Sequence, residues 1–336
     1  MKALALFSGG LDSTLAVKVI LNQGVEVIAL HFLTPLSCTD AVHQEALRKK
    51  VQEQLEVELK IIKLADDYLE ILKHPVFGYG RNLNPCIDCK ILMLKHAKAL
   101  LSETGASFVV TGEVLGQRPK SQHKDALGSI EKCSGLEGLL LRPLSAKLLP
   151  LTVVEEKGWI KREDLYGFQG RNRTPQINLA KQLGIQDYAQ PAGGCLLTNP
   201  SFCPRVKDFL EKDGIDLHSL ELLKWGKHFR ITPTFKLVVG RDEAENKLLM
   251  EHIQKGDIIF EPQELPGPTA IGRGIINDEI KTLCSCIVAR HTVSDGRQVK
   301  ITITADDGVR QVVLASGIDE IRLKELLIQQ EGYNSR

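Results

Sequence analysis

The chain has 336 residues, enough for two domains that each bury a core. Its 43 lysine and arginine residues are balanced by 42 aspartate and glutamate residues, so the formal net charge of +1 excludes a uniformly basic nucleic-acid coat. The sequence shows neither a long apolar run nor a basic leader before an apolar segment. We therefore expect a soluble protein of the cytoplasm that does not enter a membrane.

The first part of the chain alternates between strand-like and helix-like segments. Strands are predicted at residues 3–7, 25–32, 59–64, 107–111 and 139–141, and helices after the first strand, at about 40–54 and at 87–102. Short apolar strands separated by helices predict a doubly wound α/β fold, in which helices cover both faces of a parallel sheet. Ligands bind beyond the carboxyl ends of such strands, which places residues 8–13, 31–34 and 111–113 around one crevice.

The second part, from about Trp225, changes to longer strands. The predicted strands are 235–239, 257–260, 298–304 and 309–314, and the predicted helices are 242–253, 278–287 and 318–327. This pattern predicts a separate C-terminal α+β domain. We expect a nucleotide-binding domain over residues 1–180, a connecting segment that carries cysteines over 181–223, and the α+β domain over 224–336.

The loop after the first strand reads Ser8-Gly9-Gly10-Leu11-Asp12-Ser13, and a helix is expected to start there. Two glycines let the backbone approach an anion closely, and the first amides of a helix point at it. Ser13 is expected to cap this helix or to hydrogen-bond an oxygen, and Asp12 can hold a magnesium ion. The loop lacks the Gly-Lys-Ser/Thr of the mononucleotide P-loop.

This strand, loop and helix resemble the pyrophosphatase loop of the PP-loop superfamily, which cleaves ATP between its α and β phosphates. The resemblance implies a fold of the adenine nucleotide α-hydrolase type, with ATP and Mg²⁺ as ligands and Asp12 as the magnesium-holding catalytic residue. The nucleotide-binding residues that it implies are Ser8, Gly9, Gly10, Asp12, Ser13, His31, Phe32, Thr111, Gly112 and Glu113. The alternative is a tight turn that only joins a strand to a helix.

Eight cysteines in a cytoplasmic protein are more typical of metal or sulfur chemistry than of disulfides. Cys86 and Cys89 form a C-x-x-C pair just before a predicted helix, and Cys195 follows much later in a Gly-Gly-Cys element. A helix N-terminus favours the thiolate form, which binds soft metals. The pair alone fits half a zinc site, a redox pair or two ligands of a cluster. Cys38 and Cys133 stand alone, and we expect both to be inert.

Beside the pyrophosphatase loop, the elements Asn84-Pro85-Cys86-Ile87-Asp88-Cys89 and Gly194-Cys195 resemble those of tRNA thiolation enzymes of the PP-loop superfamily. In the 2-thiouridine synthetases these positions supply a cysteine pair for persulfide chemistry or three ligands to a [4Fe-4S] cluster. The resemblance therefore implies Cys86, Cys89 and Cys195 as the catalytic set, with an open iron if a cluster is present. The alternative is a structural zinc site with Cys203 as its fourth ligand.

A second element, Thr111-Gly112-Glu113-Val114-Leu115-Gly116-Gln117, resembles the 4-thiouridine synthetases. The sequence thus combines features of two thiolating branches, and the position of the sulfur on the base stays open. In the C-terminal domain, Val239-Gly240-Arg241 with Asn246 resembles the RNA-binding module of ribosome-quality-control factors. The balanced charge implies modest, shape-driven RNA binding. The alternative for this domain is packing or formation of a homodimer.

Together these resemblances imply a tRNA sulfurtransferase that adenylates a uridine carbonyl with ATP and replaces the oxygen by sulfur, giving 2-thiouridine or 4-thiouridine. Its partners would be tRNA and a sulfur donor, either sulfide or a persulfide made by a cysteine desulfurase. One alternative is a PP-loop ligase that activates a small-molecule carboxylate and needs neither the cysteines nor the C-terminal domain. Another is an ATP-gated RNA-binding protein without catalysis.

Overall fold

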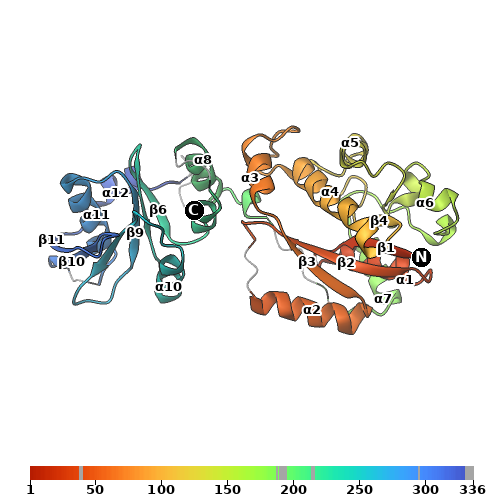
Figure 1. The fold of residues 1–336 in the computed structure, drawn as a ribbon, viewed down its shortest axis with the longest axis horizontal. Coiled ribbons are helices and arrows are strands. Elements are labelled where there is room, and N and C mark those ends of the chain that lie inside the picture. Colours follow the sequence, from red (N-terminus) through yellow and green to blue (C-terminus); the bar gives the residue numbers. More distant parts are fainter. Residues whose placement is uncertain (38–40, 187, 189–194, 213–215, 294–295, 330–336) are drawn as a thin grey trace. The chain divides into compact units, whose positions relative to one another are not determined.

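The computed structural model describes residues 1–37, 41–186, 188, 195–212, 216–293 and 296–329. The chain divides into two compact units, Met1–Thr198 and Asn199–Arg336 (Figure 1). The division falls inside the segment that we expect to connect two domains. In the described ranges, no helix combines the length and the apolar character that crossing a bilayer requires.

The first unit is built on a parallel sheet of five strands in the order β3-β2-β1-β4-β5. The strands are β1 (Lys2–Leu6), β2 (Glu26–Leu33), β3 (Glu58–Lys63), β4 (Phe108–Thr111) and β5 (Leu140–Leu141). Each predicted strand is confirmed to within one residue at either end. In the register, Leu6 of β1 lies opposite Leu30 of β2 and Thr111 of β4, so these strands end at one edge of the sheet.

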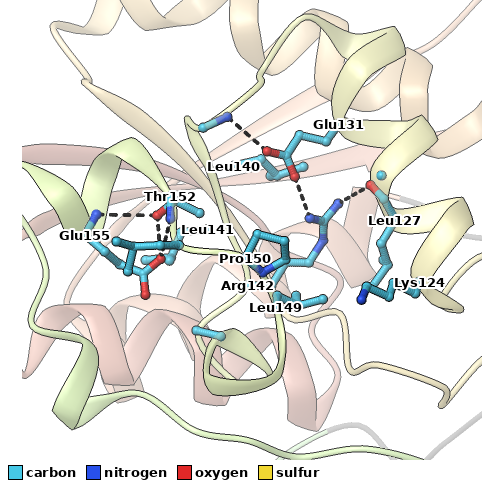
Figure 2. Close-up of a pocket in the computed structure, with 14 residues that line it drawn as sticks. Lys124, Leu127, Glu131, Leu140, Leu141, Arg142, Leu149, Pro150, Thr152 and Glu155 are labelled. Carbon is cyan, nitrogen blue, oxygen red and sulfur yellow. Dashed lines mark hydrogen bonds and ion pairs between the residues drawn. The ribbon is translucent and has the colours of Figure 1, made fainter.

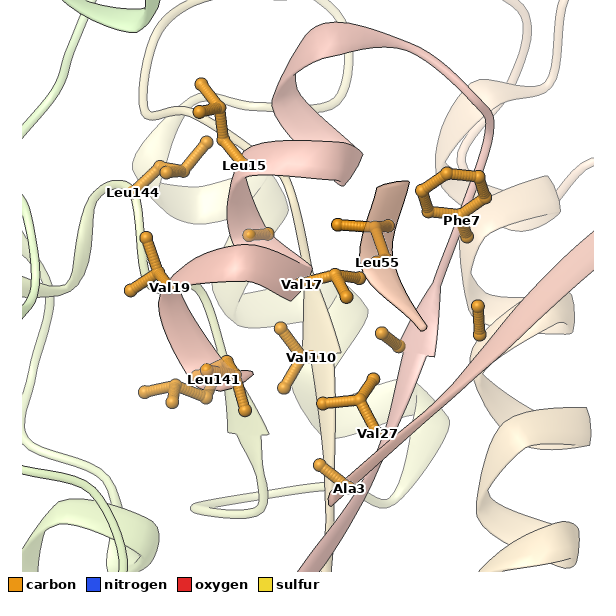
Figure 3. Packing of buried hydrophobic residues seen from close by; sticks show 14 of the residues in the cluster. Ala3, Phe7, Leu15, Val17, Val19, Val27, Leu55, Val110, Leu141 and Leu144 are labelled. Carbon is orange, nitrogen blue, oxygen red and sulfur yellow. The ribbon is translucent and has the colours of Figure 1, made fainter. Parts of the chain in front are cut away.

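Helices cover both faces of this sheet, which confirms the doubly wound α/β fold. They are α1 (Leu11–Leu21), α2 (Ala41–Leu55), α3 (Asp66–Lys73), α4 (Cys86–Thr104), α5 (Lys124–Ser134), α6 (Val153–Glu156) and α7 (Thr174–Gln182). Ala3 and Ala5 of β1 pack in one buried layer with α1, α2 and α7, part of which Figure 3 shows. Leu4 and Leu6 pack in the other layer with α4 and α5. Burial on both faces explains why β1 is a continuous apolar run.

The second unit holds an antiparallel sheet of six strands in the order β11-β10-β8-β9-β7-β6, which confirms the α+β prediction. The strands are β6 (Lys227–Thr232), β7 (Phe235–Val239), β8 (Ile258–Pro262), β9 (Ala270–Gly274), β10 (Val299–Thr304) and β11 (Arg310–Ala315). The helices are α8 (Cys203–Lys212), α9 (Leu217–Leu222), α10 (Glu243–Glu251), α11 (Asp278–Arg290) and α12 (Glu320–Leu326).

Sequence reasoning missed two strands of the second unit, β6 and β9. It missed β9 because glycine is a poor strand former and hides the apolar pattern. The structure shows why glycine is present. A Cβ atom on Gly272 would lie 2.5 Å from Cζ of Phe235 and 3.0 Å from Cε2 of Phe260, and both rings are fully buried in the core of the second unit. The missing side chain is what makes room for the two aromatic rings.

The Val239-Gly240-Arg241 motif and Asn246 have a structural role in the second unit. The Asn246 side chain accepts a hydrogen bond from the Thr269 backbone N at 3.0 Å and donates one to the Gly267 carbonyl at 3.3 Å. A side chain at position 240 would collide with Asn246 Oδ1, and Arg241 pairs with Glu245 one turn along α10. These residues join the end of β7 to α10 and to the segment before β9.

Candidate nucleotide and sulfur site

The glycine-rich loop between β1 and α1 is closed by the hydroxyl of Ser13. Gly9 has φ +76°, in the left-handed region that glycine adopts without strain, and Gly10 is the residue that caps α1. The backbone N of Ser8 donates to Ser13 Oγ at 3.3 Å, and Ser13 Oγ donates to the Gly10 carbonyl at 2.8 Å. The expectation that Ser13 caps the helix is therefore wrong, because Ser13 lies inside the first turn. Its hydroxyl donates to a backbone carbonyl within the loop, and a hydrogen bond from it to a ligand oxygen stays a prediction.

Gly112 brings the end of β4 into direct contact with this loop. A Cβ atom at position 112 would lie 2.5 Å from the Asp12 carbonyl oxygen and 2.7 Å from the Ser13 backbone N. Only glycine fits here, because a side chain would have to enter the backbone of the first turn of α1. Two of the predicted site segments, residues 8–13 and 111–113, thus meet at the edge where β1 and β4 end.

The carboxylate of Asp12 lies in a polar network that joins three segments of the unit. Its Oδ2 accepts hydrogen bonds from Gln117 Nε2 at 2.7 Å and from Arg173 Nη2 at 3.2 Å. Gln117 in turn accepts a hydrogen bond from Gln176 Nε2 at 2.9 Å. Prediction from the sequence missed Gln176 and gave Arg173 no place at the nucleotide loop. No local pattern links either residue to Asp12, which lies 161 residues before Arg173.

Glu113 is a buried carboxylate rather than a surface ligand. It is 3% exposed, and its Oε2 accepts hydrogen bonds from Thr111 Oγ1 at 3.0 Å and from Arg142 Nε at 3.3 Å. Burial alone would raise the pKa of Glu113. The positive charges of Lys90 and Arg142 and these two hydrogen bonds lower it by a larger amount. The pKa of Glu113 therefore lies below its usual value, and Glu113 is ionised at neutral pH.

Arg142 is fully engaged in this buried network. Besides Glu113, it donates from Nη1 to Glu131 Oε2 and from Nη2 to the Leu127 carbonyl, both at 3.0 Å. Figure 2 shows these two bonds at a cavity of about 240 Å³ between α5, β5 and residues 149–152. None of the residues that the family resemblance implies for the nucleotide or the sulfur lines this cavity. Arg142, which sequence reasoning also considered as a contact for ATP phosphates, lines it and is held by these buried bonds instead. The nucleotide site at the loop after β1 stays a prediction that is separate from this cavity.

His31 and Phe32 lie at the carboxyl end of β2, next to the glycine-rich loop. Nδ1 of His31 lies 2.9 Å from the carbonyl oxygen of Phe7, the residue that follows β1. Burial lowers the pKa of His31, and the hydrogen bond to Phe7 only partly offsets this effect, so the ring is neutral at pH 7. The ring of Phe32 lies 6.2 Å from that of His96. Adenine contact by His31 and Phe32 stays a prediction.

The C-x-x-C pair lies in the first turn of α4. Cys86 is the first residue of the helix, and its Sγ accepts a hydrogen bond from Asn84 Nδ2 at 3.0 Å. Burial is the main cause that raises the pKa of Cys89 to about 12. The positive charge of Lys90 opposes this rise, and negative charge at Cys195 and Cys86 adds to it. The three predicted cysteines are thus within electrostatic range of one another.

Tyr68 of α3 lies beside this group of cysteines and was not predicted. It is 1% exposed, and burial raises its pKa well above the ordinary value, to which the charges of Cys195, Cys89 and Cys86 add. A hydrogen bond from Thr34, after β2, acts in the opposite direction. Tyr68 therefore stays protonated and provides a buried hydroxyl next to the sulfur atoms. A single tyrosine in a short helix carries no sequence signal for such a role.

A cluster or a zinc ion requires three or more ligand side chains that converge on one point. Across the described ranges, no group of three or more His, Cys, Asp or Glu side chains is arranged to hold a metal ion. In this arrangement the cysteines do not fit a metal centre, and no step is derived through one. Cys38 and residues 191–194, just before Cys195, lie outside the described residues.

Cys89 is expected to resist alkylation at pH 8, because with a pKa of about 12 only about one molecule in ten thousand carries the reactive thiolate. Cys133 of α5 is exposed and is the internal control. With iodoacetamide and peptide mass spectrometry, we expect Cys89 to react at least about 100-fold more slowly than Cys133. The Cys89 rate should rise with pH, since deprotonation increases towards the pKa. Equal rates at pH 8 would contradict this assignment.

The fold and the loop together define a class of protein. The strand order reverses between β1 and β4, and ligands of open α/β sheets bind beyond the strand ends at such a switch point. Here that point is occupied by the glycine-rich loop, the start of α1 and Gly112. A parallel sheet with this order and a Ser-Gly-Gly-x-Asp-Ser loop at its switch point is the arrangement that the resemblance to PP-loop nucleotide-binding domains implies.

Comparison with known families assigns both units. Residues 1–147 match the family described as Thiamine biosynthesis protein (ThiI), and residues 226–325 match the NFACT protein RNA binding domain. The first unit is thus similar to the ThiI family and the second to the NFACT RNA binding domain, and most of the curated relatives compared are described as tRNA sulfurtransferases or probable tRNA sulfurtransferases.

Two of these relatives come from archaea. A probable tRNA sulfurtransferase of Thermococcus kodakarensis is 32% identical over 150 residues, which are 43% of this chain and 36% of the relative. Another of Methanothermobacter thermautotrophicus is 26% identical over 247 residues, 68% of this chain and 54% of the relative. The chain therefore spans about half or less of the length of these relatives. A solved 4-thiouridine synthetase–RNA complex with bound ATP aligns with 66% of this chain and 52% of its own, at 24% identity and TM-score 0.41.

Proposed function

We propose that this protein is an ATP-dependent tRNA sulfurtransferase that converts a uridine carbonyl to a thiocarbonyl. The observation that carries the proposal is the proximity of the nucleotide loop to the cysteines. Lys90, which follows Cys89 in α4, lies close enough for its charge to lower the pKa of both Glu113, next to the loop, and Cys89. An activated base held at the loop would therefore lie near the sulfur atoms. The similarity to tRNA sulfurtransferases supports the same conclusion.

In the first step, ATP binds with its pyrophosphate in the loop of residues 8–13. The flexible glycines and the N-terminus of α1 supply backbone N–H groups and a favourable dipole for the phosphates. Asp12 is the residue that would hold magnesium, whose charge stabilises the departing pyrophosphate. The oxygen of a uridine carbonyl attacks the α phosphate, pyrophosphate leaves, and the base carries AMP on that oxygen.

In the second step, sulfur replaces the activated oxygen. With sulfide as the donor, HS⁻ attacks the ring carbon, the C–O bond breaks, and AMP leaves with the electron pair while a proton is lost from sulfur. No oxidant or reductant is consumed. Cys86, Cys89 and Cys195 form the candidate sulfur centre, and Asn84 is placed to hydrogen-bond a negative sulfur on Cys86. With a cysteine persulfide as the donor, a thiol reductant would have to reduce the disulfide that remains.

The second unit is proposed to bind the tRNA. Its match to the NFACT protein RNA binding domain supports this role. The chain is almost neutral as a whole, with a formal net charge of +1, so RNA binding should depend on shape and local contacts more than on bulk charge. We propose a cytoplasmic enzyme, with sulfide or a desulfurase-derived persulfide as its donor.

The test is an anaerobic reaction of the full chain with bulk tRNA, magnesium-ATP and sulfide, followed by nuclease digestion and mass spectrometry of thionucleosides. We expect an ATP-dependent thionucleoside that disappears in Asp12→Ala and Cys86→Ala but persists in Cys133→Ala, whose exposed cysteine serves as the control. Formation of AMP only with a small carboxylate and ammonia would replace the proposal by a ligase. Binding of tRNA with neither AMP nor thionucleoside would replace it by an RNA-binding protein.

A further inference from the structure

Arg173 lies immediately before helix α7, at its N-cap, and its side chain contacts the glycine-rich loop. It is the residue that precedes Thr174, at the N-terminal end of α7, and its Nη2 lies 3.2 Å from Asp12 Oδ2. Both side chains are largely buried, with exposed fractions of 25% for Arg173 and 16% for Asp12. Two helix N-termini, those of α1 and α7, are thereby joined by one ion pair at the place proposed for the triphosphate.

The network around this ion pair is incomplete. Asp12 Oδ1, Arg173 Nε and Gln176 Oε1 are buried and make no hydrogen bond within the described part of the chain. Gln176 is fully buried. Buried polar atoms are nearly always hydrogen-bonded in folded proteins, because an unpaired one costs about 1–3 kcal/mol. Three unpaired atoms in one network indicate that a polar ligand completes it.

The chemistry of the loop indicates an anion with a cation. The loop of residues 8–13 contains no lysine, whereas other phosphate-binding loops carry one that contacts the β and γ phosphates. The planar guanidinium of Arg173 suits the bidentate recognition of phosphate. One of its N–H groups, at Nη2, donates to Asp12. Among the described residues, Asp12 Oδ1 has no hydrogen-bond partner, and a carboxylate oxygen is a ligand that magnesium prefers.

We propose that Arg173 is a latch for the pyrophosphate half of ATP. Without nucleotide, it neutralises Asp12 and prevents an unpaired carboxylate from repelling the incoming phosphates. When magnesium-ATP binds, Asp12 turns to the metal and Arg173 transfers to the β and γ phosphate oxygens. This inference rests on the proposed function, because it requires that the loop binds ATP. It adds a phosphate-binding residue and a charge exchange to that site.

Affinity measurements test the phosphate contact. Isothermal titration calorimetry of Arg173→Ala with magnesium and α,β-methylene-ATP should give a dissociation constant raised about 10- to 100-fold, the range for a charged hydrogen bond. Binding of AMP, which lacks the pyrophosphate, should be unchanged. Arg173→Lys keeps a positive charge but loses the two-pronged guanidinium, so its dissociation constant should lie between those of the wild type and Arg173→Ala. Lys181→Ala removes an exposed cation from the other end of α7 and should bind like the wild type.

A double-mutant cycle tests the latch itself. Asp12→Asn removes the charge that holds Arg173, so magnesium-free α,β-methylene-ATP should bind this variant several-fold more tightly than the wild type. The gain should be smaller in the Arg173→Ala background, because there no guanidinium is released. An equal gain in both backgrounds would show simple relief of repulsion by Asp12 and would overturn the latch.

The outcomes separate this inference from the function on which it rests. If the wild-type chain binds no adenine nucleotide, the proposed function and the latch both fail. If the wild type and Arg173→Ala bind α,β-methylene-ATP equally, the latch fails and the proposed function stands. Thermal unfolding of each variant checks that α7 is intact. If Arg173→Ala has a lower melting temperature than the wild type, the test rests on Arg173→Lys instead. An Arg173→Lys variant that binds α,β-methylene-ATP as tightly as the wild type would overturn the proposed contact between the guanidinium and the phosphates.

Discussion

Replacing Gly112 by alanine is expected to weaken ATP binding at least about 100-fold, the cost of displacing a binding element by about an ångström. The new Cβ would lie 2.5 Å from the Asp12 carbonyl and 2.7 Å from the Ser13 backbone N, and both of these atoms belong to the first turn of α1. Backbone cannot rotate away as a side chain can. The helix N-terminus and the glycine-rich loop must therefore shift together. The free energy of unfolding should fall by about 1–3 kcal/mol, as for other overpacked sites.

Gly128→Ala is the matched control for this prediction. Gly128 lies inside α5, where a Cβ meets nothing within 4 Å, so alanine should stabilise the helix by about 0.4–1 kcal/mol and leave ATP affinity unchanged. Calorimetric titration and urea unfolding of both variants measure the two effects. Normal ATP affinity in Gly112→Ala would show that the contact between β4 and α1 does not position the nucleotide loop.

Arg142→Met is expected to lower the free energy of unfolding by about 3–5 kcal/mol, the usual cost of breaking a buried ion pair from one side. Arg142 is 4% exposed and its partner Glu113 is 3% exposed, so the variant leaves a buried carboxylate without its cation. The hydrogen bonds to Glu131 and to the Leu127 carbonyl are lost as well. Lys300→Met, which breaks an exposed pair with Glu264, should change stability by less than about 0.5 kcal/mol.

The pH dependence follows from the lowered pKa of Glu113. A carboxyl group whose pKa is lower in the folded than in the unfolded chain stabilises the fold above its ordinary pKa of 4.5. That stabilisation is lost as the pH falls through the folded pKa. In Arg142→Met the unpaired carboxylate can protonate, so the deficit relative to the wild type should be largest at neutral pH and shrink in acid.

A second substitution checks that the buried charge is the cause. Glu113→Gln in the Arg142→Met background replaces the carboxylate by a neutral amide of the same shape, and we expect it to recover part of the lost stability at pH 7. Urea unfolding at pH 5 and pH 7 measures both effects. If the double variant is no more stable than Arg142→Met, packing rather than charge accounts for the loss.

The sequence by itself determined the class of the first unit, because the relevant signals are local. A strand buried on both faces must be a continuous apolar run, and a loop that approaches phosphates needs glycine, so β1 and residues 8–13 could be recognised without a structure. The C-x-x-C pair and Cys195 were recognised through family resemblance. In the second unit, β7, β8, β10 and β11 followed from their apolar residues, but β6 and β9 did not. In β9, Gly272 lowers the local strand propensity and makes room for two aromatic rings that are distant in the sequence.

Only the tertiary structure decided which polar side chains complete the site. Arg173 and Gln176 reach Asp12 and Gln117 from a helix far along the chain, and Tyr68 is brought to the cysteines by α3. Such pairings leave no periodicity in the sequence, because a single hydrogen bond requires only one suitable residue at one position. The structure also reassigned Ser13 from helix cap to loop closure. A local motif is stabilised by residues close to it in the sequence, so the sequence reveals it. A buried polar contact is stabilised by residues that come together only when the chain folds.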